Sequence, residues 1–343
     1  MSLRTLEGWD GLVSITDKYF SYMDNQGSDI STAFPRTGLQ CLRVGSTTDL
    51  LFIPIPHGGT PSNEIYLGFA FRTNVFPPSH TSFCRFYDTE FAGSLLSVNA
   101  DGQLAVWGAT QQEDSGAYEL TLDTWHYIEV KMIKSSSSSA GDVIVKVDGV
   151  EWINCSSGKD YLGSGAAQTN CIAFRGAAGG YNYFDDVYIC DETGAQCNTF
   201  LGQVKIATIY PDGNGNTSDF VGSDSNSVDN YLLVDDTTSD DDATYSESGT
   251  PTELDLYTYG AAPSDITVLG VQVNSYLRKD TTGDQHLARH ITRVGGSNYE
   301  GPNLYPGFDY MYHADIWELN PNGDVVWTES TINGAEFGIK VQT

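Results

Sequence analysis

The sequence predicts an all-β protein. Apolar and polar residues alternate with a period of two in one segment after another, as expected when one face of a strand is buried. Helical periodicity is nearly absent. The composition agrees, because 36 Gly, 20 Tyr and 15 Phe among 343 residues are typical of many strands joined by tight turns.

The strands of the first 200 residues can be followed in order. "IYLGFAFRTN" (65–74) and "NCIAFRG" (170–176) have the composition of buried strands. "LLSVNADGQLAVWG" (95–108) predicts a hairpin that turns at Asp101-Gly102, and "DVIVKVDGVEW" (142–152) predicts one that turns at Asp148-Gly149. The strand "WHYIEVKMI" (125–133) precedes the polar run "KSSSSSAGD", which predicts an exposed loop.

The composition changes near residue 200. From Pro211 to Pro251 the chain is polar and acidic and resembles a disordered linker. The apolar pieces "YLLVDD" and "LDLYTYG" favour long ordered loops around short strands at least as strongly. Further on, "DITVLGVQVNSYLRKD" (265–280) predicts a strand with Leu269, Val271 and Val273 on one face. We therefore expect two domains, 1–200 and 201–343.

Charge and cysteine usage narrow the cellular setting. The chain has 45 acidic and 17 basic residues, a net charge of −28, which disfavours nucleic acid and anionic membranes as partners. No run approaches the roughly 18 apolar residues of a membrane span, and "MSLRTLEGWDGL" lacks the apolar core of a secretory signal. The six cysteines form no CxxC pair, so zinc is not expected. In a reducing cytoplasm disulfides are not expected either; a Cys190–Cys197 bridge is the alternative.

The order of segments in residues 1–200 resembles a concanavalin A-like, laminin-G-type jelly roll. The segments are "LEGWDGL", "GLQCLRV", "YLGFAFRTN", "LSVNADGQLAVW", "LDTWHYIEVKMI", "VIVKVDGVEW" and "YFDDVYICDETG". The resemblance implies a jelly-roll sandwich for this part of the chain.

The remaining segments resemble the C-terminal half of structural proteins of tailed bacteriophage virions. They are "TFLGQVKIATIYPDGNGNTSDF", "VDDTTSDDDATY" and "ADIWELNPNGDVVWTESTINGAEFGIKV". The resemblance implies a non-enzymatic capsid decoration, fibre or tail-associated protein that is assembled into the virion in the bacterial host cytoplasm. Its partners would be other virion proteins, and we expect a homo-oligomer, a trimer rather than a dimer, with the second domain in the contact. The alternative function is a glycan-binding module on a phage fibre or on a secreted bacterial protein.

Adjacent carboxylates in "YNYFDDVYICDETG" (181–194) raise the question of a metal site. In jelly rolls this segment is the last strand, where we expect one aspartate to accept hydrogen bonds and the other to face solvent. Calcium is the alternative for Asp185 and Asp186 and for Asp235 and Asp236, which belong to an acidic cluster with Asp240, Asp241 and Asp242. No cofactor other than calcium is indicated. The loop "PDGNGNTSD" starts like a calcium loop but has Thr217 where glycine is required.

The sequence indicates no catalytic residues. Retaining glycosidases need paired carboxylates, and the nearest E-x-D-x-x-E match, at Glu253 and Asp255, has Thr258 in the last position. His286 and His290 have the spacing of a helical metal pair without the Glu of H-E-x-x-H. No G-x-S-x-G nucleophile elbow is present. We therefore expect the protein not to be an enzyme.

Glycan recognition would require exposed aromatic side chains beside polar groups. The residues that could serve are Trp107, Trp152, Tyr181 and Tyr183. Aromatic residues in such positions more often pack in a core or a turn.

Overall fold

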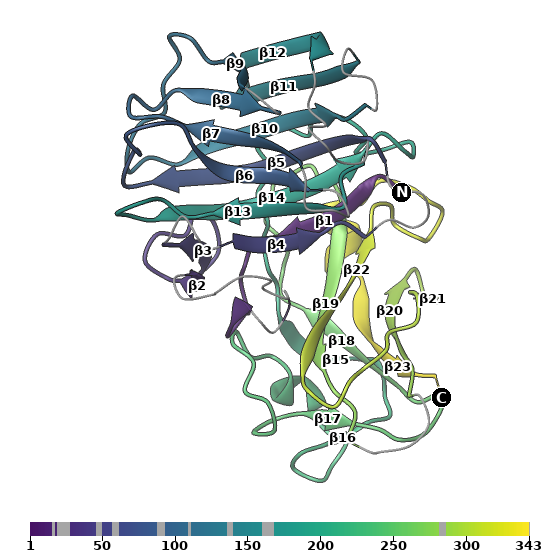
Figure 1. The fold of residues 1–343 in the computed structure, drawn as a ribbon. Helices are drawn as coiled ribbons and strands as arrows, with labels where there is room; N and C mark the ends of the chain where they lie inside the picture. The colour runs from purple at the N-terminus through teal and green to yellow at the C-terminus, as the bar shows by residue number, and fades with distance from the viewer. Residues whose placement is uncertain are drawn as a thin grey trace. The chain divides into compact units, whose positions relative to one another are not determined.

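The computed structural model describes residues 1–15, 18, 28–45, 50–56, 62–87, 93–108, 111–135, 140–159, 168–280 and 286–342. Strand accounts for 46% of the structure and helix for 3%, so the all-β prediction is confirmed. The chain divides into two compact units (Figure 1). The first comprises Met1–Asp10 and Ser14–Ile206, and the second comprises Gly11–Val13 and Ala207–Thr343.

The first unit contains two antiparallel sheets (Figure 1). Sheet A consists, in spatial order, of β12 (Val150–Lys159), β11 (Gly141–Val147), β10 (His126–Ile133), β5 (Glu64–Thr73), β14 (Asn182–Asp191), β3 (Cys41–Val44) and β2 (Ser28–Ser31), with β1 (Leu3–Glu7) paired to β14. Sheet B consists of β4 (Leu50–Pro54), β13 (Cys171–Arg175), β6 (Thr81–Tyr87), β7 (Gly93–Val98), β8 (Leu104–Trp107) and β9 (Gln111–Asp114).

An aromatic core joins the two sheets. Phe69 and Phe184 of sheet A contact Phe174 of sheet B, with ring centroids 5.1 Å and 4.2 Å away. Phe71 of sheet A stacks on Phe83 of sheet B at 4.3 Å. Fully burying such side chains stabilises a fold by roughly 1.5–3 kcal/mol each. The first unit is thus the concanavalin A-like jelly-roll sandwich that the sequence predicts.

The other face of sheet A is covered by the chain itself. The Tyr188 hydroxyl donates to Glu129 Oε1 at 2.6 Å and accepts from the Leu201 N–H at 3.1 Å. Glu129 Oε1 also accepts from the Gly202 N–H at 2.9 Å. The Tyr188 ring lies across Gly68, where an added Cβ would come within 2.0 Å of a ring carbon. This close approach requires glycine on β5.

The second unit is built on a five-stranded sheet, sheet C. Its strands are β15 (Pro211–Ser218), β18 (Leu254–Tyr259), β23 (Glu336–Val341), β20 (Ala288–Val294) and β21 (Ser297–Glu300). The other elements are the pair β16 (Val221–Gly222) and β17 (Ser246–Glu247), the pair β19 (Val271–Leu277) and β22 (Met311–Trp317), the 3₁₀ helix η2 (Asn230–Leu233) and the short helix α1 (Glu329–Asn333). The acidic tract 211–251 is therefore ordered around short strands.

The core of the second unit lies around Trp327 and Phe337, whose ring centroids are 6.4 Å apart. Val273 of β19 and Val294 of β20 belong to the same apolar cluster.

Within the described residues, no helix has the length and apolar character needed to cross a membrane. All six cysteines are free thiols. Cys190, one of the two cysteines of the alternative bridge, is buried, and its Sγ lies 3.7 Å from the Thr199 carbonyl oxygen.

Candidate functional site

The outward face of sheet B carries a polar cavity of about 400 Å³. Strand alternation produces it. Leu96 of β7 pairs with Val106 of β8 in the core, and the adjacent residues Leu95 and Trp107 pair on the outward face. The cavity is lined by His80, Thr81, Ser82, Leu95, Ser97, Trp107 and Arg175. Because these residues lie on or beside β6, β7, β8 and β13, a hydrogen-bonded sheet holds the lining in place.

Neutral hydrogen bonds fix the Trp107 ring. Its Nε1–H donates to Ser97 Oγ at 2.7 Å, and the same hydroxyl lies 3.2 Å from His80 Nδ1. The His80 ring meets the Trp107 ring edge-on, with centroids 5.9 Å apart. Burial lowers the pKa of His80, although Asp114 opposes the shift, so the imidazole is neutral at neutral pH. Trp107 is thus a half-buried aromatic surface with a polar rim.

Two arginines meet at Ser82, and one of them, Arg175, lines the cavity. Ser82 Oγ accepts hydrogen bonds from Arg85 Nε and from an Arg175 Nη, each at 3.0 Å. Arg85 also donates to the Tyr87 hydroxyl at 2.8 Å. The sequence alone does not indicate a role for Ser82, Arg85, Arg175 or His80. Ser82 and Arg175 are 93 positions apart. Only the pairing of β6 with β13 brings them together.

The other aromatic candidates do not line this cavity. Trp152 stacks on Tyr118 at 5.5 Å with an interplanar angle of 13°. Tyr181 is 38% exposed and lies under the Arg43 guanidinium, whereas Tyr183 is 3% exposed and lies beneath Arg72. A side chain as buried as Tyr183 offers a sugar ring no free face.

Both Asp185 and Asp186 are fully buried, so the expectation that one of them faces solvent is wrong. The cause is a bulge in β14, where the pairing with β5 shifts between Asp185 and Tyr188 and Asp186 adopts a φ of 50°. Asp186 forms an ion pair with Arg36 and accepts from the Ile206 N–H at 2.7 Å. The two aspartates therefore hold the segments around Arg36 and Ile206 against strand β14.

Burial changes the pKa of the Asp185 carboxyl group. Its carboxylate accepts from the backbone N–H groups of Arg36 and Asp186, both at 2.8 Å. Burial, and then the neighbouring charge of Asp186, nevertheless raise the pKa of Asp185 to about 8. Among the described residues, no three His, Cys, Asp or Glu side chains converge as metal ligands.

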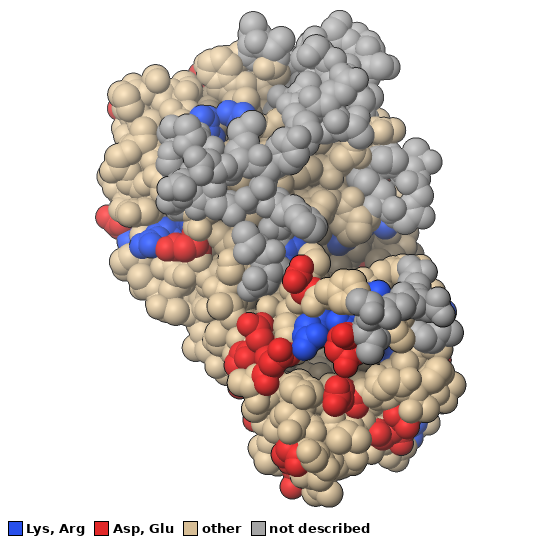
Figure 2. Space-filling model, turned by 60° about the horizontal axis from the view of Figure 1, so that its bottom comes forward, with Lys and Arg blue, Asp and Glu red and all other residues tan. Residues whose placement is uncertain are grey.

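The acidic cluster of the second unit is held by hydrogen bonds to polar partners. Thr244 Oγ1 donates toward Asp236 at 3.2 Å and Asp240 at 3.0 Å. Asp242 pairs with Arg278 at 2.8 Å, and Asp241 accepts from the Tyr276 hydroxyl at 3.0 Å. Figure 2 shows acidic side chains gathered on one face of this unit beside a small basic group. A calcium role for Asp235 stays a prediction.

Two further sequence patterns resolve into structural contacts. Asp212, from the loop that begins like a calcium loop, lies on β15 and accepts from Thr258 Oγ1 at 2.9 Å. Asp255, from the incomplete glycosidase motif, is fully buried and accepts from the Phe220 N–H and from Asn230 Nδ2. Glu253 accepts a hydrogen bond from the Ser248 hydroxyl.

His290 lies on strand β20 and not on a helix, so it cannot form a helical metal pair with His286. Its Nε2 is 2.8 Å from Ser275 Oγ, and its Nδ1 is 2.6 Å from Asp315 Oδ2. This order of groups is that of a serine hydrolase triad. The His290 side chain is 0% exposed, however. A leaving group must contact the imidazole to take its proton, so the chain of hydrogen bonds is structural.

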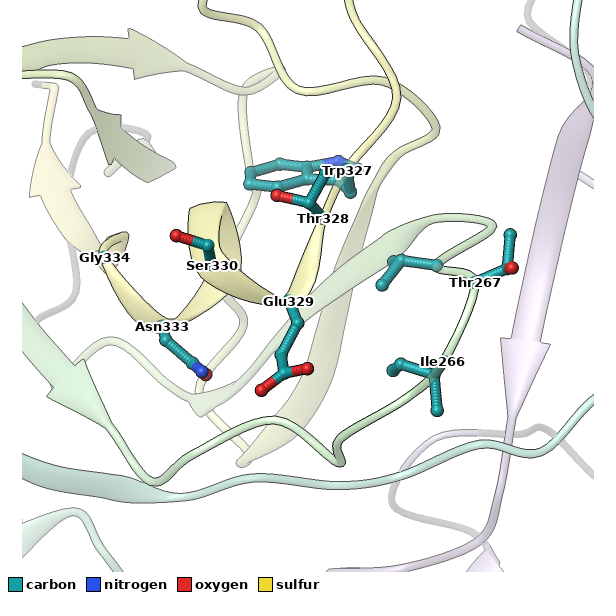
Figure 3. Close-up of a pocket in the computed structure, with 9 residues that line it drawn as sticks. Ile266, Thr267, Trp327, Thr328, Glu329, Ser330, Asn333 and Gly334 are labelled. Carbon is teal, nitrogen blue, oxygen red and sulfur yellow. The ribbon is translucent and has the colours of Figure 1, made fainter.

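A larger hollow, of about 860 Å³, lies in the second unit. Figure 3 shows its wall, formed by Trp327, helix α1 and the segment around Ile266. Its polar groups hold the local fold, since the Thr328 side chain caps α1 and Asn333 Oδ1 accepts from the Ala262 N–H at 2.8 Å. Among the described residues that line it, Glu329 alone is charged, so this hollow offers less varied chemistry than the sheet B cavity.

Comparisons with known proteins extend to solved structures alone. No family model matches the chain, and no curated protein matches it. One similar solved structure is that of alginate lyase Aly36B, with 13% identity, 54% of this chain and 86% of that chain covered, and a TM-score of 0.35. Another is the catalytic domain of a glycoside hydrolase family 131 protein from Coprinopsis cinerea, with 14% identity, coverages of 54% and 86%, and a TM-score of 0.35.

A third is domain 4 of AbnA, a GH43 extracellular arabinanase from Geobacillus stearothermophilus, in complex with arabinotriose. Its identity is 14%, its coverages are 48% and 75%, and its TM-score is 0.32. The expectation that the chain is not an enzyme is contradicted, because matched structures include an alginate lyase and a glycoside hydrolase catalytic domain. The virion role is not tested by these comparisons and stays a prediction. At these TM-scores the likeness defines no substrate for this chain.

Proposed function

We propose that the first unit binds a polysaccharide in the cavity on sheet B. The observation that carries the proposal is the Trp107 ring. Its Nε1–H donates to Ser97 Oγ at 2.7 Å, and the Ser82 hydroxyl and the His80 imidazole line the same cavity. Sugar rings present C–H groups on their faces and hydroxyls at their edges. An aromatic surface with donors and acceptors around it complements both.

The size and placement of the cavity support the same function. Its volume of about 400 Å³ lies within the roughly 300–1,000 Å³ of typical ligand pockets. It opens on the outward face of sheet B, whereas the corresponding face of sheet A is covered by residues around Leu201 and Gly202. A preformed site on paired strands loses little conformational entropy when it binds.

Affinity electrophoresis of the full chain through gels containing neutral and acidic polysaccharides tests the proposal. We expect at least one polysaccharide to retard the chain, and Trp107→Ala to weaken that binding by on the order of tenfold. Trp152→Ala is the matched control, because it removes the same side chain from a site where it stacks on Tyr118. Equal retardation of both variants and the unaltered chain, or no retardation by any polysaccharide, would refute the proposal.

The virion role that the sequence resemblance implies is a separate question. A glycan site of this kind is equally compatible with a phage fibre and with a secreted bacterial protein. Incubating the recombinant chain with phage particles and measuring co-sedimentation would test the virion role without reference to the cavity.

A further inference from the structure

The hydrogen bonds of Ser97 decide which nitrogen of His80 carries the proton. The Ser97 hydroxyl donates to the Ala105 carbonyl at 3.2 Å, and its oxygen accepts from Trp107 Nε1–H at 2.7 Å. His80 Nδ1 lies 3.2 Å from the same oxygen. A hydroxyl has one proton and two acceptor lone pairs, so all three contacts are hydrogen bonds only when His80 Nδ1–H is a donor. Ser97 is 1% exposed, and burial favours the arrangement that satisfies every group. The neutral imidazole therefore has its lone pair on Nε2.

His80 Nε2 is open to a ligand. It has no hydrogen-bond partner among the residues that the structure describes, and it is not a buried atom. His80 lines the cavity beside Trp107, and the two rings meet edge-on with centroids 5.9 Å apart. A hydrogen-bond acceptor therefore lies at the edge of the aromatic surface, within reach of the hydroxyls of a sugar ring that lies on Trp107.

This lone pair gives His80 a role in the proposed glycan site. We propose that His80 Nε2 accepts a hydrogen bond from a sugar hydroxyl, so that the cavity binds glycan while the imidazole is neutral and releases it when the imidazole is protonated. A bound sugar also removes water from Nε2, which disfavours a charged imidazole. Acidification therefore weakens binding both by filling the acceptor lone pair and by placing a charge under the ligand. This inference rests on the proposed glycan-binding function.

The groups around His80 set the pH range of the effect. Burial lowers the pKa of His80 below the 6.5 of an unperturbed imidazole, and Asp114 of β9 opposes the shift. The other charged groups on the surrounding strands are Arg85 of β6 and Arg175 of β13, which both donate to the lining residue Ser82 and stay charged throughout this range. The affinity should therefore be constant above about pH 6.5 and fall, by up to about tenfold for each pH unit, below the pKa of His80.

Two amide variants distinguish the nitrogen atoms of His80. The glutamine amide reaches the position of Nε2 and supplies an acceptor that does not titrate, whereas the shorter asparagine reaches only the position of Nδ1. Isothermal titration calorimetry at pH 4.5, 5.5, 6.5 and 8 measures the affinity of the full chain for dextran, arabinoxylan, mixed-linkage β-glucan and polygalacturonate. We expect at least one polymer to bind at pH 8 and to bind at least about threefold more weakly at pH 4.5. His80→Gln should keep the affinity within about threefold and lose the pH dependence, and His80→Asn should bind roughly tenfold more weakly at pH 8.

The variants also define the results that overturn the inference. The same pH dependence in His80→Gln would assign it to another group, because that variant keeps every other titrating side chain. Equal affinity of His80→Asn and the unaltered chain would show that Nε2 accepts no bond from the ligand, and affinity that rises on acidification would make the imidazole a donor. Each result overturns this inference alone if Trp107→Ala still weakens binding. The pH profile of the unaltered chain carries the test if His80→Asn loses its β-type circular dichroism spectrum. Absence of binding to all four polymers at every pH overturns the proposed function as well.

Discussion

The buried carboxyl of Asp185 should make the stability of the first unit fall as the pH rises. Burial, and then the charge of Asp186, raise the pKa of Asp185 to about 8 in the folded chain, against roughly 3.9 for an unperturbed aspartate. Between these values the folded state holds one proton more than the unfolded state. Its free energy of unfolding then decreases by about 1.4 kcal/mol for each pH unit, and the decrease ends above the folded pKa.

The variant Asp185→Asn isolates this effect. Asparagine cannot ionise, so the variant should lack this part of the pH dependence. Relative to the unaltered chain it should gain about 3 kcal/mol between pH 5.5 and pH 7.5, two units at about 1.4 kcal/mol each. The change with pH is the readout, because the loss of an acceptor for the Asp186 N–H lowers the variant's stability by a similar amount at every pH.

Urea denaturation followed by tryptophan fluorescence at four pH values measures the difference. Asp101→Asn, at an exposed position in the β7–β8 turn, is the matched control and should run parallel to the unaltered chain. Parallel curves for Asp185→Asn as well would show that Asp185 is already ionised at pH 5.5. In that case the backbone N–H groups of Arg36 and Asp186 would outweigh burial, and the reasoning would fail.

Two further substitutions test packing and hydrogen bonding. Gly68→Ala should destabilise the first unit by about 2–4 kcal/mol, because the new Cβ displaces the Tyr188 ring; a urea midpoint equal to that of the unaltered chain would contradict this. His290→Gln should destabilise the second unit by about 2–4 kcal/mol through the lost contacts to Ser275 and Asp315, measured by calorimetry. If Asp315→Asn in the same chain adds its full separate effect, the two residues are not coupled.

The strands could be predicted because alternation and turn chemistry are local. The β11–β12 hairpin turns at Asp148-Gly149, and these two residues have φ values of 52° and 81°, the left-handed conformation that such turns require. The β7–β8 hairpin turns over residues 99–103, which include the predicted Asp101-Gly102, and there Gly102 has a φ of 84°. In both cases a few neighbouring residues carry all the information, so no knowledge of the rest of the chain is needed.

The burial of both aspartates could not be predicted because a bulge breaks the alternation. A regular strand sends adjacent side chains to opposite faces, which is why one of Asp185 and Asp186 was expected in solvent. The shift in pairing before Tyr188 and the left-handed backbone at Asp186 turn both carboxylates inward. Their partners Arg36 and Ile206 lie far away in the sequence, so no local pattern announces the bulge.

The residues in and beside the sheet B cavity also differ in whether the sequence could predict their role. Trp107 could be selected from the sequence, since aromatic side chains beside polar groups are the usual candidates for sugar binding. Arg85 and Arg175 look alone like ordinary polar positions on alternating strands. Their significance depends on the register of β6 against β13, which brings two cations to one hydroxyl. Register is a property of strand pairs, so the meeting of these two arginines at Ser82, and the place of Arg175 in the lining of the cavity, could not be read from either strand alone.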